Sequence, residues 1–475
     1  MPRIIKLVAP VAVLLAPLAA GAQPFSALSE EARAYVNVSE TSVALTNVRV
    51  VDGTGAPPRE NQTIVIENGR IGAVGPAADV RVPAGARVLT LAGHTVVPGF
   101  VGVHNHMFYM TRGRSVQLSF SAPRLYLASG VTTVRTTGSS MPYQDLNMKR
   151  AIERGEAPGP RMHLTGPYVT GSGGMGMMVQ VATPEDARRI VNYWADEGVT
   201  WIKAYTTISR DALRAVIEEA HKRGLQVTGH LCSVSYREAA ALGIDNLEHG
   251  FFTSSDYVPD RAPDQCPSTM RDSLLNVAME GPDVQETIRD MVGRGVAMSS
   301  TLAVYELSYP ERPPLDERAL EAMSEETRQE YLTARQEISD RSDRSTMPEL
   351  FRRAQEFERA FVKAGGLLGS GVDPTGMGGA LPGLGDQRNF ELLIEAGFTP
   401  AEAVQIMSLN GAKILRVDDR LGSIARGKTA DLVVIRGNPV ANPREIRNVT
   451  TVFKDGVGYE SAKLLADVKG RVGVR

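Results

Sequence analysis

Cysteine is almost absent from this chain: Cys232 and Cys266 are the two among 475 residues. Two cysteines form one bridge at most, which excludes the class of small secreted domains held together by a disulfide framework. Cys232 follows His230 by two residues. The sequence leaves open whether Cys232 packs as a small apolar side chain or forms a bridge with Cys266.

An excess of one charge sign is also missing. The chain has 52 Lys and Arg against 54 Asp and Glu, a formal net charge of -2, and its Lys and Arg form no basic cluster. Basic clusters are typical of proteins that bind nucleic acid or acidic membranes. We therefore expect no nucleic-acid partner.

A long apolar run occurs at the start of the chain, over residues 7–19, and it is shorter than the ~20 residues that a spanning helix needs. Arg3 and Lys6 precede it, and Ala20-Gly21-Ala22 follows. This order predicts a signal peptide over residues 1–22 and a mature chain that begins at Gln23; an N-terminal membrane anchor is the alternative. We expect a periplasmic or secreted protein with no membrane span after cleavage. Because the residue directly after the predicted cleavage site is Gln23 and not Cys, a lipid anchor is not expected.

The mature chain, about 450 of the 475 residues, is too long for one ordinary core and suits a large domain with a smaller one. Short alternating runs open it, and Asn68-Gly69 between two of them is a hairpin signal. The C-terminal part repeats this pattern. The strand-like runs are 43–51, 63–67, 70–74, 431–435 and 449–453. We predict one composite β-sandwich built from segments 42–97 and 415–465.

Between these segments, short apolar strands alternate with stretches such as 184–198 and 211–224, whose apolar residues recur at helical spacing. Eight such strands predict an α/β fold, a (β/α)8 TIM barrel over residues 98–414. The alternative, a doubly wound sheet, needs a Gly-rich phosphate-binding turn after the first strand, and this strand ends in His104-Asn105-His106 instead. The predicted strands are 97–106, 130–135, 161–166, 199–205, 225–230, 244–249, 295–302 and 366–373.

One connection in the predicted barrel is unusually long. Residues 303–364 begin with a Pro-rich stretch and continue as a charged helical stretch over 315–358. Such an insertion forms a lid or a subunit contact, or it is a solvated addition without a role in the site, and both interpretations remain open. We expect a homo-oligomer.

Histidines mark the ends of several predicted strands. His104 and His106 lie two apart on the first strand, so their side chains point to the same side and can bind one ion together. His230 and His249 end strands five and six, and Asp373 ends strand eight. The carboxyl ends of barrel strands meet at one mouth. Imidazole and carboxylate ligands with positions left open for water describe a catalytic metal site, and the absence of Cys among them fits an exported hydrolase.

Lys203, near the end of the fourth predicted strand, allows two interpretations. In the first, its ammonium pairs with Asp373 or another carboxylate, and the site holds one ion. In the second, the amine has reacted with carbon dioxide, and the resulting carbamate is an anionic ligand that bridges two ions about 3.5 to 4 Å apart.

This set of residues resembles the amidohydrolase superfamily, which carries His-x-His, Lys, His, His and Asp on successive barrel strands framed by a split β-sandwich. Four runs are similar to its imidazolonepropionase-related and Xaa-Pro dipeptidase (prolidase)-like branch. They are Trp201-Ile-Lys-Ala-Tyr205, Val227-Thr-Gly-His230, Leu247-Glu-His-Gly250 and Ser370-Gly-Val-Asp-Pro374. The chain departs from the family where relatives often carry Asp, at Gly102 and at Thr136.

The resemblance implies two divalent metal ions, which we expect to be zinc. His104, His106 and Asp373 would bind one ion, His230 and His249 would bind the other, and carboxylated Lys203 would bridge them. A water shared by the ions would then attack a carbonyl. Asp373 is predicted to act both as ligand and as the general base that passes the proton to the leaving nitrogen.

Candidate substrate contacts surround these ligands. His163, Tyr168 and Tyr205 are candidate hydrogen-bond donors to the developing oxyanion. Arg135 is a candidate partner for a substrate carboxylate. The glycine-rich run 171–178 is expected to be a loop that lines the pocket.

The predicted function is hydrolysis of a carbon–nitrogen amide bond in a small molecule or short peptide, either a dipeptide of the Xaa-Pro kind or an N-acyl amino acid. Hydrolysis of a lactone, an ester or a cyclic amide is an alternative, because the same metals attack any activated carbonyl. A metal-binding scaffold without catalysis is an alternative of another class. Asp373, which proton transfer requires, argues against the scaffold.

Overall fold

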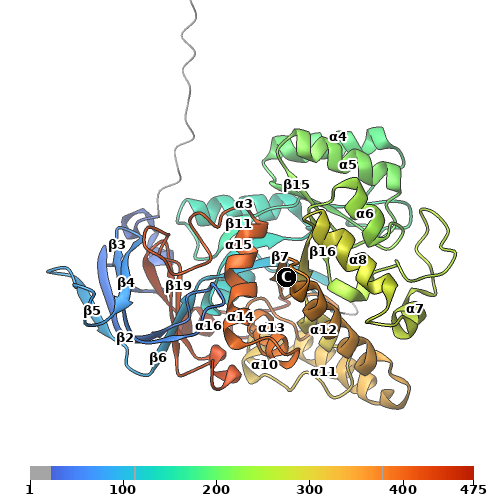
Figure 1. Ribbon diagram of the computed structural model, residues 1–475. Coiled ribbons are helices and arrows are strands. Elements are labelled where there is room, and N and C mark those ends of the chain that lie inside the picture. The colour runs from blue at the N-terminus through green and yellow to red at the C-terminus, as the bar shows by residue number, and fades with distance from the viewer. Residues whose placement is uncertain (1–22, 112–113, 377, 475) are drawn as a thin grey trace, which may run out of the picture.

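The computed structural model describes residues 23–111, 114–376 and 378–474 and has two parts, a barrel and a smaller sheet domain (Figure 1). The predicted signal peptide lies outside these described residues. Within them, no helix is both long and apolar enough to cross a bilayer.

The small domain is one nine-stranded sheet that both ends of the chain build together. Its order is β1-β21-β20-β19-β6-β2-β3-β4, with β5 paired to β2. The N- and C-terminal segments join where β6 and β19 pair antiparallel, and Figure 1 shows these strands side by side. The nine strands are β1 (Val36–Val38), β2 (Ser42–Val50), β3 (Arg59–Glu67), β4 (Arg70–Pro76), β5 (Arg87–Thr90), β6 (His94–Pro98), β19 (Leu432–Arg436), β20 (Val449–Lys454) and β21 (Val457–Glu460).

Local sequence explains this sheet. The β3–β4 hairpin turns at Asn68 and Gly69, with φ of 50° and 77°, the backbone that the Asn-Gly pair favours in a two-residue turn. Alternate side chains such as Val43, Leu45 and Ile64 are buried in a core of the domain's own. The predicted composite domain therefore forms, with its strands hydrogen-bonded into one continuous sheet.

The barrel contains every predicted strand, and each is shorter than expected except the second, which has the expected 6 residues. The main parallel sheet has the order β12-β14-β15-β16-β17-β18, and a second sheet has the order β11-β10-β7. The bounds are β7 (Phe100–Asn105), β10 (Val131–Thr136), β11 (Arg161–His163), β12 (Tyr168–Thr170), β14 (Trp201–Ala204), β15 (Gln226–Gly229), β16 (Asn246–Glu248), β17 (Ala297–Ser300) and β18 (Leu368–Ser370).

Single hydrogen bonds close the ring where regular pairing stops. The Thr200 amide donates to Leu164 O at 2.9 Å, next to β11. On the opposite side the Asp373 amide donates to His104 O at 3.0 Å, which joins the eighth strand to the first. The (β/α)8 prediction is confirmed. The ring has eight strands when β11 and β12, which follow each other in the chain, are counted together as the third; the short strands β8 (Phe108–Met110), β9 (Ser115–Gln117) and β13 (Val179–Gln180) lie outside it.

Amphipathic helices cover the barrel, as the spacing predicts for α4 and α5. Thr183 and Ser209 cap these two helices through their side-chain oxygens. The helices are α1 (Glu30–Arg33), α2 (Ser121–Ala128), α3 (Pro142–Glu153), α4 (Pro184–Glu197), α5 (Arg210–Lys222), α6 (Tyr236–Leu242), α7 (Met270–Asn276), α8 (Pro282–Gly293), α9 (Leu302–Glu306), α10 (Glu317–Ala322), α11 (Glu325–Ser339), α12 (Met347–Lys363), α13 (Leu384–Glu395), α14 (Pro400–Gln405), α15 (Gly411–Ile414) and α16 (Ser461–Asp467). Shorter helical turns are η1 (Phe25–Ala27), η2 (Gly250–Thr253), η3 (Ser342–Arg344), η4 (Ile406–Asn410) and η5 (Pro443–Arg447).

The long connection after β17 divides into several helices. Its last helix, α12, buries Phe357, Glu358 and Phe361 against the barrel, and Ser300 Oγ donates to Glu358 Oε2 at 2.9 Å. Helix α12 is thus the barrel helix between strands β17 and β18. The predicted insertion 303–364 thus includes this barrel helix as well as α10 and α11.

Candidate active site

Two histidines and one aspartate converge at the carboxyl ends of β7 and β18. His104 Nε2 lies 3.5 Å from Asp373 Oδ2, and His106 Nε2 lies 3.3 Å from Asp373 Oδ1. One ligand atom from each residue lies within 4.8 Å of the others, and all three residues are buried. This group can hold a metal ion, as the i, i+2 spacing predicts.

A hydrogen bond at Nδ1 orients three of the histidines. His104 Nδ1 donates to Glu248 Oε2 at 2.6 Å, and His106 Nδ1 donates to Gly138 O at 2.9 Å. His249 Nδ1 lies 2.8 Å from Thr301 Oγ1. Each ring therefore keeps Nε2 for another ligand, the arrangement that metal-binding histidines show.

His230, His249 and Lys203 complete the floor of the site. The ring centroids of His230 and His249 lie 4.4 Å apart, and those of His104 and His249 lie 4.5 Å apart. Lys203 Nζ is buried, and no described atom accepts a hydrogen bond from it. Burying an amine without a hydrogen-bond partner costs free energy. The described protein atoms alone therefore do not satisfy Lys203 Nζ.

Burial sets the protonation of these groups. Desolvation lowers the pKa of His104, lowers the pKa of His230 to about 3 and lowers the pKa of His249 well below its usual value, so these imidazoles are neutral near pH 7. Burial also lowers the pKa of Lys203 to about 8. Burial by itself would raise the pKa of Asp373, but His104 and His106 outweigh it and lower that pKa. The result is neutral nitrogen donors around a carboxylate, which suits a cation.

Two of the site residues have a backbone conformation that side chains rarely adopt. His249 has φ of 68° and Asp373 has φ of 47°, both in the left-handed region. Such positions persist when the surrounding structure holds them, and they cluster at functional sites. Here they turn the two side chains toward the common floor.

The floor belongs to a cavity of about 350 Å³. Tyr168 and Tyr205 line it, as predicted, and so do Met175 and Met177 from the glycine-rich loop 171–178. The sequence pattern did not single out several other lining residues. They are Met110, Thr137, Val304, Tyr305, Ser308, Thr375 and Gly376.

Two predicted substrate contacts require correction. Arg135 is fully buried, donates to Glu248 Oε1 at 2.6 Å and has its guanidinium carbon 4.4 Å from the centroid of the Trp201 ring, so it cannot meet a substrate carboxylate. His163 is not among the cavity's lining residues. Burial lowers its pKa to about 4, and the positive charge of Lys149 adds to that effect.

Glu248 is the functional residue that the sequence did not reveal. It is fully buried and binds His104, Arg135 and Asn246. Burial would raise the pKa of Glu248, but Arg135 and Lys203 lower it well below its usual value, so it stays a carboxylate. Its place directly before His249 in the Leu-Glu-His-Gly run was the available signal.

The backbone at Gly102 lies close to the side chain of Asn105. A Cβ at Gly102 would lie 2.1 Å from Asn105 Oδ1, which is too close for any side chain unless Asn105 moves. Asn105 Nδ2 donates to Asp386 Oδ1 at 3.4 Å. The space beside residue 102 is therefore occupied by a neighbouring amide.

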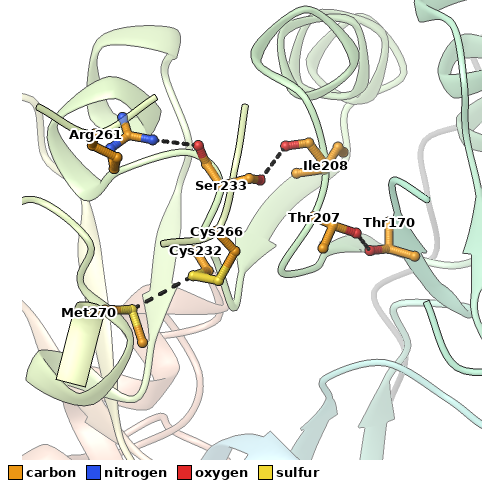
Figure 2. The surroundings of a disulfide bond; sticks show 8 residues. All are labelled: Thr170, Thr207, Ile208, Cys232, Ser233, Arg261, Cys266 and Met270. Atoms are coloured by element: carbon orange, nitrogen blue, oxygen red, sulfur yellow. Dashed lines mark hydrogen bonds between the residues drawn. A yellow bond between two sulfur atoms is a disulfide. The ribbon is translucent and has the colours of Figure 1, made fainter. Parts of the chain in front are cut away.

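Cys232 and Cys266 form a disulfide, which decides between the two alternatives for Cys232. Cys232 follows His230 by two residues, and Figure 2 shows the bridge beside the loop in which Ser233 Oγ donates to Ile208 O at 2.6 Å. Arg261 Nη1 donates to Ser233 O at 2.6 Å in the same region. The segment that follows His230 is thereby fixed to the segment around Cys266.

Solved structures share this architecture. A protein from Bifidobacterium longum, provisionally described as a prolidase, is 26% identical, with a TM-score of 0.65 over 90% of this chain and 98% of its own. A Xaa-Pro dipeptidase with bound methionine is 20% identical, with a TM-score of 0.66 over 88% of this chain and 100% of its own.

A curated relative matches over a shorter stretch. The N-substituted formamide deformylase of Arthrobacter pascens is 43% identical over 63 residues, which is 13% of this chain and 11% of the relative. The match therefore covers only a small part of either protein. It is local and does not extend across the barrel.

The profile of the amidohydrolase family matches residues 95–458, from β6 of the sheet domain through the whole barrel to β21. This match confirms the family predicted from the histidine, lysine and aspartate positions. It also confirms, at the level of the family, the prediction of a hydrolase that acts on carbon–nitrogen bonds. The chain belongs to the amidohydrolase family.

Proposed function

We propose that this protein hydrolyses a carbon–nitrogen amide bond of a small molecule or short peptide, with divalent metal bound at the floor of its cavity. The observation that carries the proposal is the convergence of His104, His106 and Asp373 within 4.8 Å. Burial and mutual charge keep two kinds of donor there, neutral nitrogen and ionised oxygen.

We propose that the site holds two ions and that both are zinc. His104, His106 and Asp373 would hold the first ion, and His230 with His249 would hold the second. A bound divalent ion supplies polarisation of the substrate carbonyl and acidification of water. Neutral imidazole and carboxylate are ligands that zinc accepts in catalytic sites.

Lys203 is proposed to bridge the two ions as a carbamate. Its buried Nζ lacks a hydrogen-bond acceptor in the described structure, and burial lowers its pKa to about 8, which raises the share of neutral amine. A neutral amine adds to carbon dioxide and releases one proton. The anionic product would satisfy the position that the free amine leaves unpaired.

Asp373 and the tyrosines then serve the proton transfers. The carboxylate of Asp373 would take a proton from the attacking water and pass it to the leaving nitrogen. Burial raises the pKa of Tyr205 to about 12 and raises that of Tyr168 well above its usual value. Both phenols therefore stay protonated and can donate to the developing oxyanion.

A dipeptide of the Xaa-Pro kind or an N-acyl amino acid is the proposed substrate. The similarity to a provisionally described prolidase supports this class. Because Arg135 is held by Glu248, it is not available to bind a substrate carboxylate. Recognition would depend on the walls of the cavity.

We also propose that the protein works outside the cytoplasm. The Cys232–Cys266 bridge supports this location, because disulfides persist in oxidising compartments.

The proposed function is tested by metal analysis and a substrate screen on the same preparation. We expect about two divalent ions per chain, and turnover of some dipeptides or N-acyl amino acids that chelator removes and zinc restores. One ion per chain, unchanged by added bicarbonate, would support the single-ion interpretation with free Lys203. A protein that binds two ions and cleaves no amide would contradict the proposed activity.

A further inference from the structure

One wall of the cavity is apolar and does not belong to the main barrel core. Phe108, Tyr168 and Met178 form a separate buried cluster, and Met110, Met177 and Tyr205 pack against it while remaining partly exposed. Four of these six side chains, those of Met110, Tyr168, Met177 and Tyr205, also line the cavity. The cluster thus presents an apolar face to the space above the proposed metal ligands.

Methionines of the glycine-rich loop extend this face toward the mouth. Met175 lines the cavity and keeps 45% of its surface exposed. The loop is anchored at its start, because Thr207 Oγ1 donates to Ser172 O at 3.0 Å and pairs with Thr170, as Figure 2 shows. Methionine is unbranched and adapts to irregular shapes, so an anchored loop with exposed methionines suits apolar groups of varied form.

An aromatic pair forms another part of the lining. Tyr305 lines the cavity and stacks on Phe252 with ring centroids 3.7 Å apart and an interplanar angle of 3°. Its centroid lies 5.5 Å from that of His249. A group bound between the methionines and Tyr305 would therefore lie next to the proposed metal ligands.

We propose that the substrate carries an uncharged aryl or branched alkyl group on one side of its scissile amide, and that this group packs against Met175, Met177 and their cluster. This inference rests on the proposed function and specifies its substrate class. A charged group at the same place would lose its hydration without gaining a partner from the methionines. An apolar group would lose only unfavourable contact with water.

The experiment compares matched N-acyl amino acids with zinc-loaded wild-type protein. Phenylacetyl-, acetyl- and succinyl-glycine vary the acyl side, and acetyl-phenylalanine, acetyl-glycine and acetyl-glutamate vary the amine side. In one of the two series, acyl or amine, we expect kcat/KM of the apolar compound to exceed that of acetyl-glycine by about 10-fold or more. The charged compound is expected to fall below that reference.

Substitutions then identify the wall responsible. Met175→Gln and Met177→Gln keep the side-chain length but add a polar amide, and each should reduce the apolar-to-reference ratio by about 10-fold. Met175→Leu and Met177→Leu should preserve it. Met141→Gln is the matched control, because Met141 is 46% exposed and does not line the cavity. Unchanged ratios in both glutamine variants would overturn the proposal.

Binding measurements separate this proposal from the proposed function. Dissociation constants of the same compounds on the Asp373→Asn variant, measured by calorimetry, report the apolar preference without turnover. Apolar preference in binding with no cleavage by wild type would contradict the proposed function and support the apolar wall. Cleavage without preference, or equal binding of charged and apolar compounds, would overturn the apolar wall alone.

Discussion

His104 Nδ1 lies 2.6 Å from Glu248 Oε2, although 144 residues separate them in the chain. The carboxylate is an acceptor, so it places the proton on Nδ1 and leaves Nε2 of His104 free toward Asp373. Glu248 in turn is held by Arg135 at 2.6 Å. A buried ion pair beneath the floor thus orients one of the proposed metal ligands.

Glu248→Gln should weaken metal binding, because an amide holds His104 less firmly. Loss of a group that orients a ligand costs about 10- to 100-fold in metal affinity or activity. The variant also leaves Arg135 unpaired in the interior, which destabilises the fold by about 3 kcal/mol. Chelator competition measures the affinity, and thermal unfolding measures the stability.

The double variant Arg135→Met/Glu248→Gln separates these two effects. Removing both charges should recover most of the thermal stability, because no buried charge is left alone. The metal affinity should stay low. Recovery of metal affinity together with stability would show that Glu248 acts on the fold and not on His104.

Asp373→Asn and His106→Ala should behave differently. The asparagine keeps an oxygen ligand but cannot accept a proton, so we expect turnover to fall by ~10²- to 10⁴-fold or more while metal content falls much less. His106→Ala should lose one ion and activity together. Metal content and turnover are measured on the same preparations. Near-normal turnover in Asp373→Asn would remove Asp373 from the mechanism.

Glu358 should make stability depend on pH. Burial raises the pKa of Glu358 to about 8 in the folded protein, against an ordinary value of 4.5. The folded state therefore keeps a proton that the unfolded chain releases, and stability is lost as the pH rises from 4.5 through 8. Relative to Glu358→Gln, which stays neutral and can still bond Ser300, wild type should lose on the order of 5 kcal/mol across this window.

Denaturant unfolding at a series of pH values measures this difference. Glu356→Gln is the control, since Glu356 lies on the same helix with 45% of its side chain exposed. This control should follow wild type at every pH. A wild-type stability that runs parallel to that of Glu358→Gln from pH 4 to 9 would contradict a protonated Glu358.

Removing the disulfide should destabilise the protein. The bridge closes a loop between residues 34 positions apart, and a loop of this length contributes about 3 to 4 kcal/mol in the chain-entropy account. Thermal unfolding of Cys232→Ser/Cys266→Ser should show this loss. Reductant should lower the Tm of wild type and leave that of the double variant unchanged; an unaffected wild type would show that the bridge contributes no stability.

Export predicts a mature chain that begins at Gln23. N-terminal sequencing of protein from an exporting host measures the cleavage site directly. Protein that retains Met1 and sediments with membranes would favour the N-terminal anchor instead.

The sequence by itself determined the barrel, the joined sheet domain and the positions of the proposed metal ligands. These follow from local patterns: a period of two or of three to four in apolar residues, Asn-Gly at a hairpin, and two histidines on one face of a strand. A strand end such as His230 or Asp373 can be read from its neighbours, and the closure of a barrel brings all strand ends to one mouth.

The tertiary structure alone decided which polar groups pair and which side chains form the walls. Arg135 lies near the carboxyl end of its strand, where a substrate-binding residue is expected, yet its partner is Glu248, 113 residues away. The disulfide, the position of α12 in the barrel and the cluster around Met177 likewise depend on contacts between distant segments. A one-dimensional pattern shows which way a side chain points along its own element, but the group that it meets is set by how the elements pack.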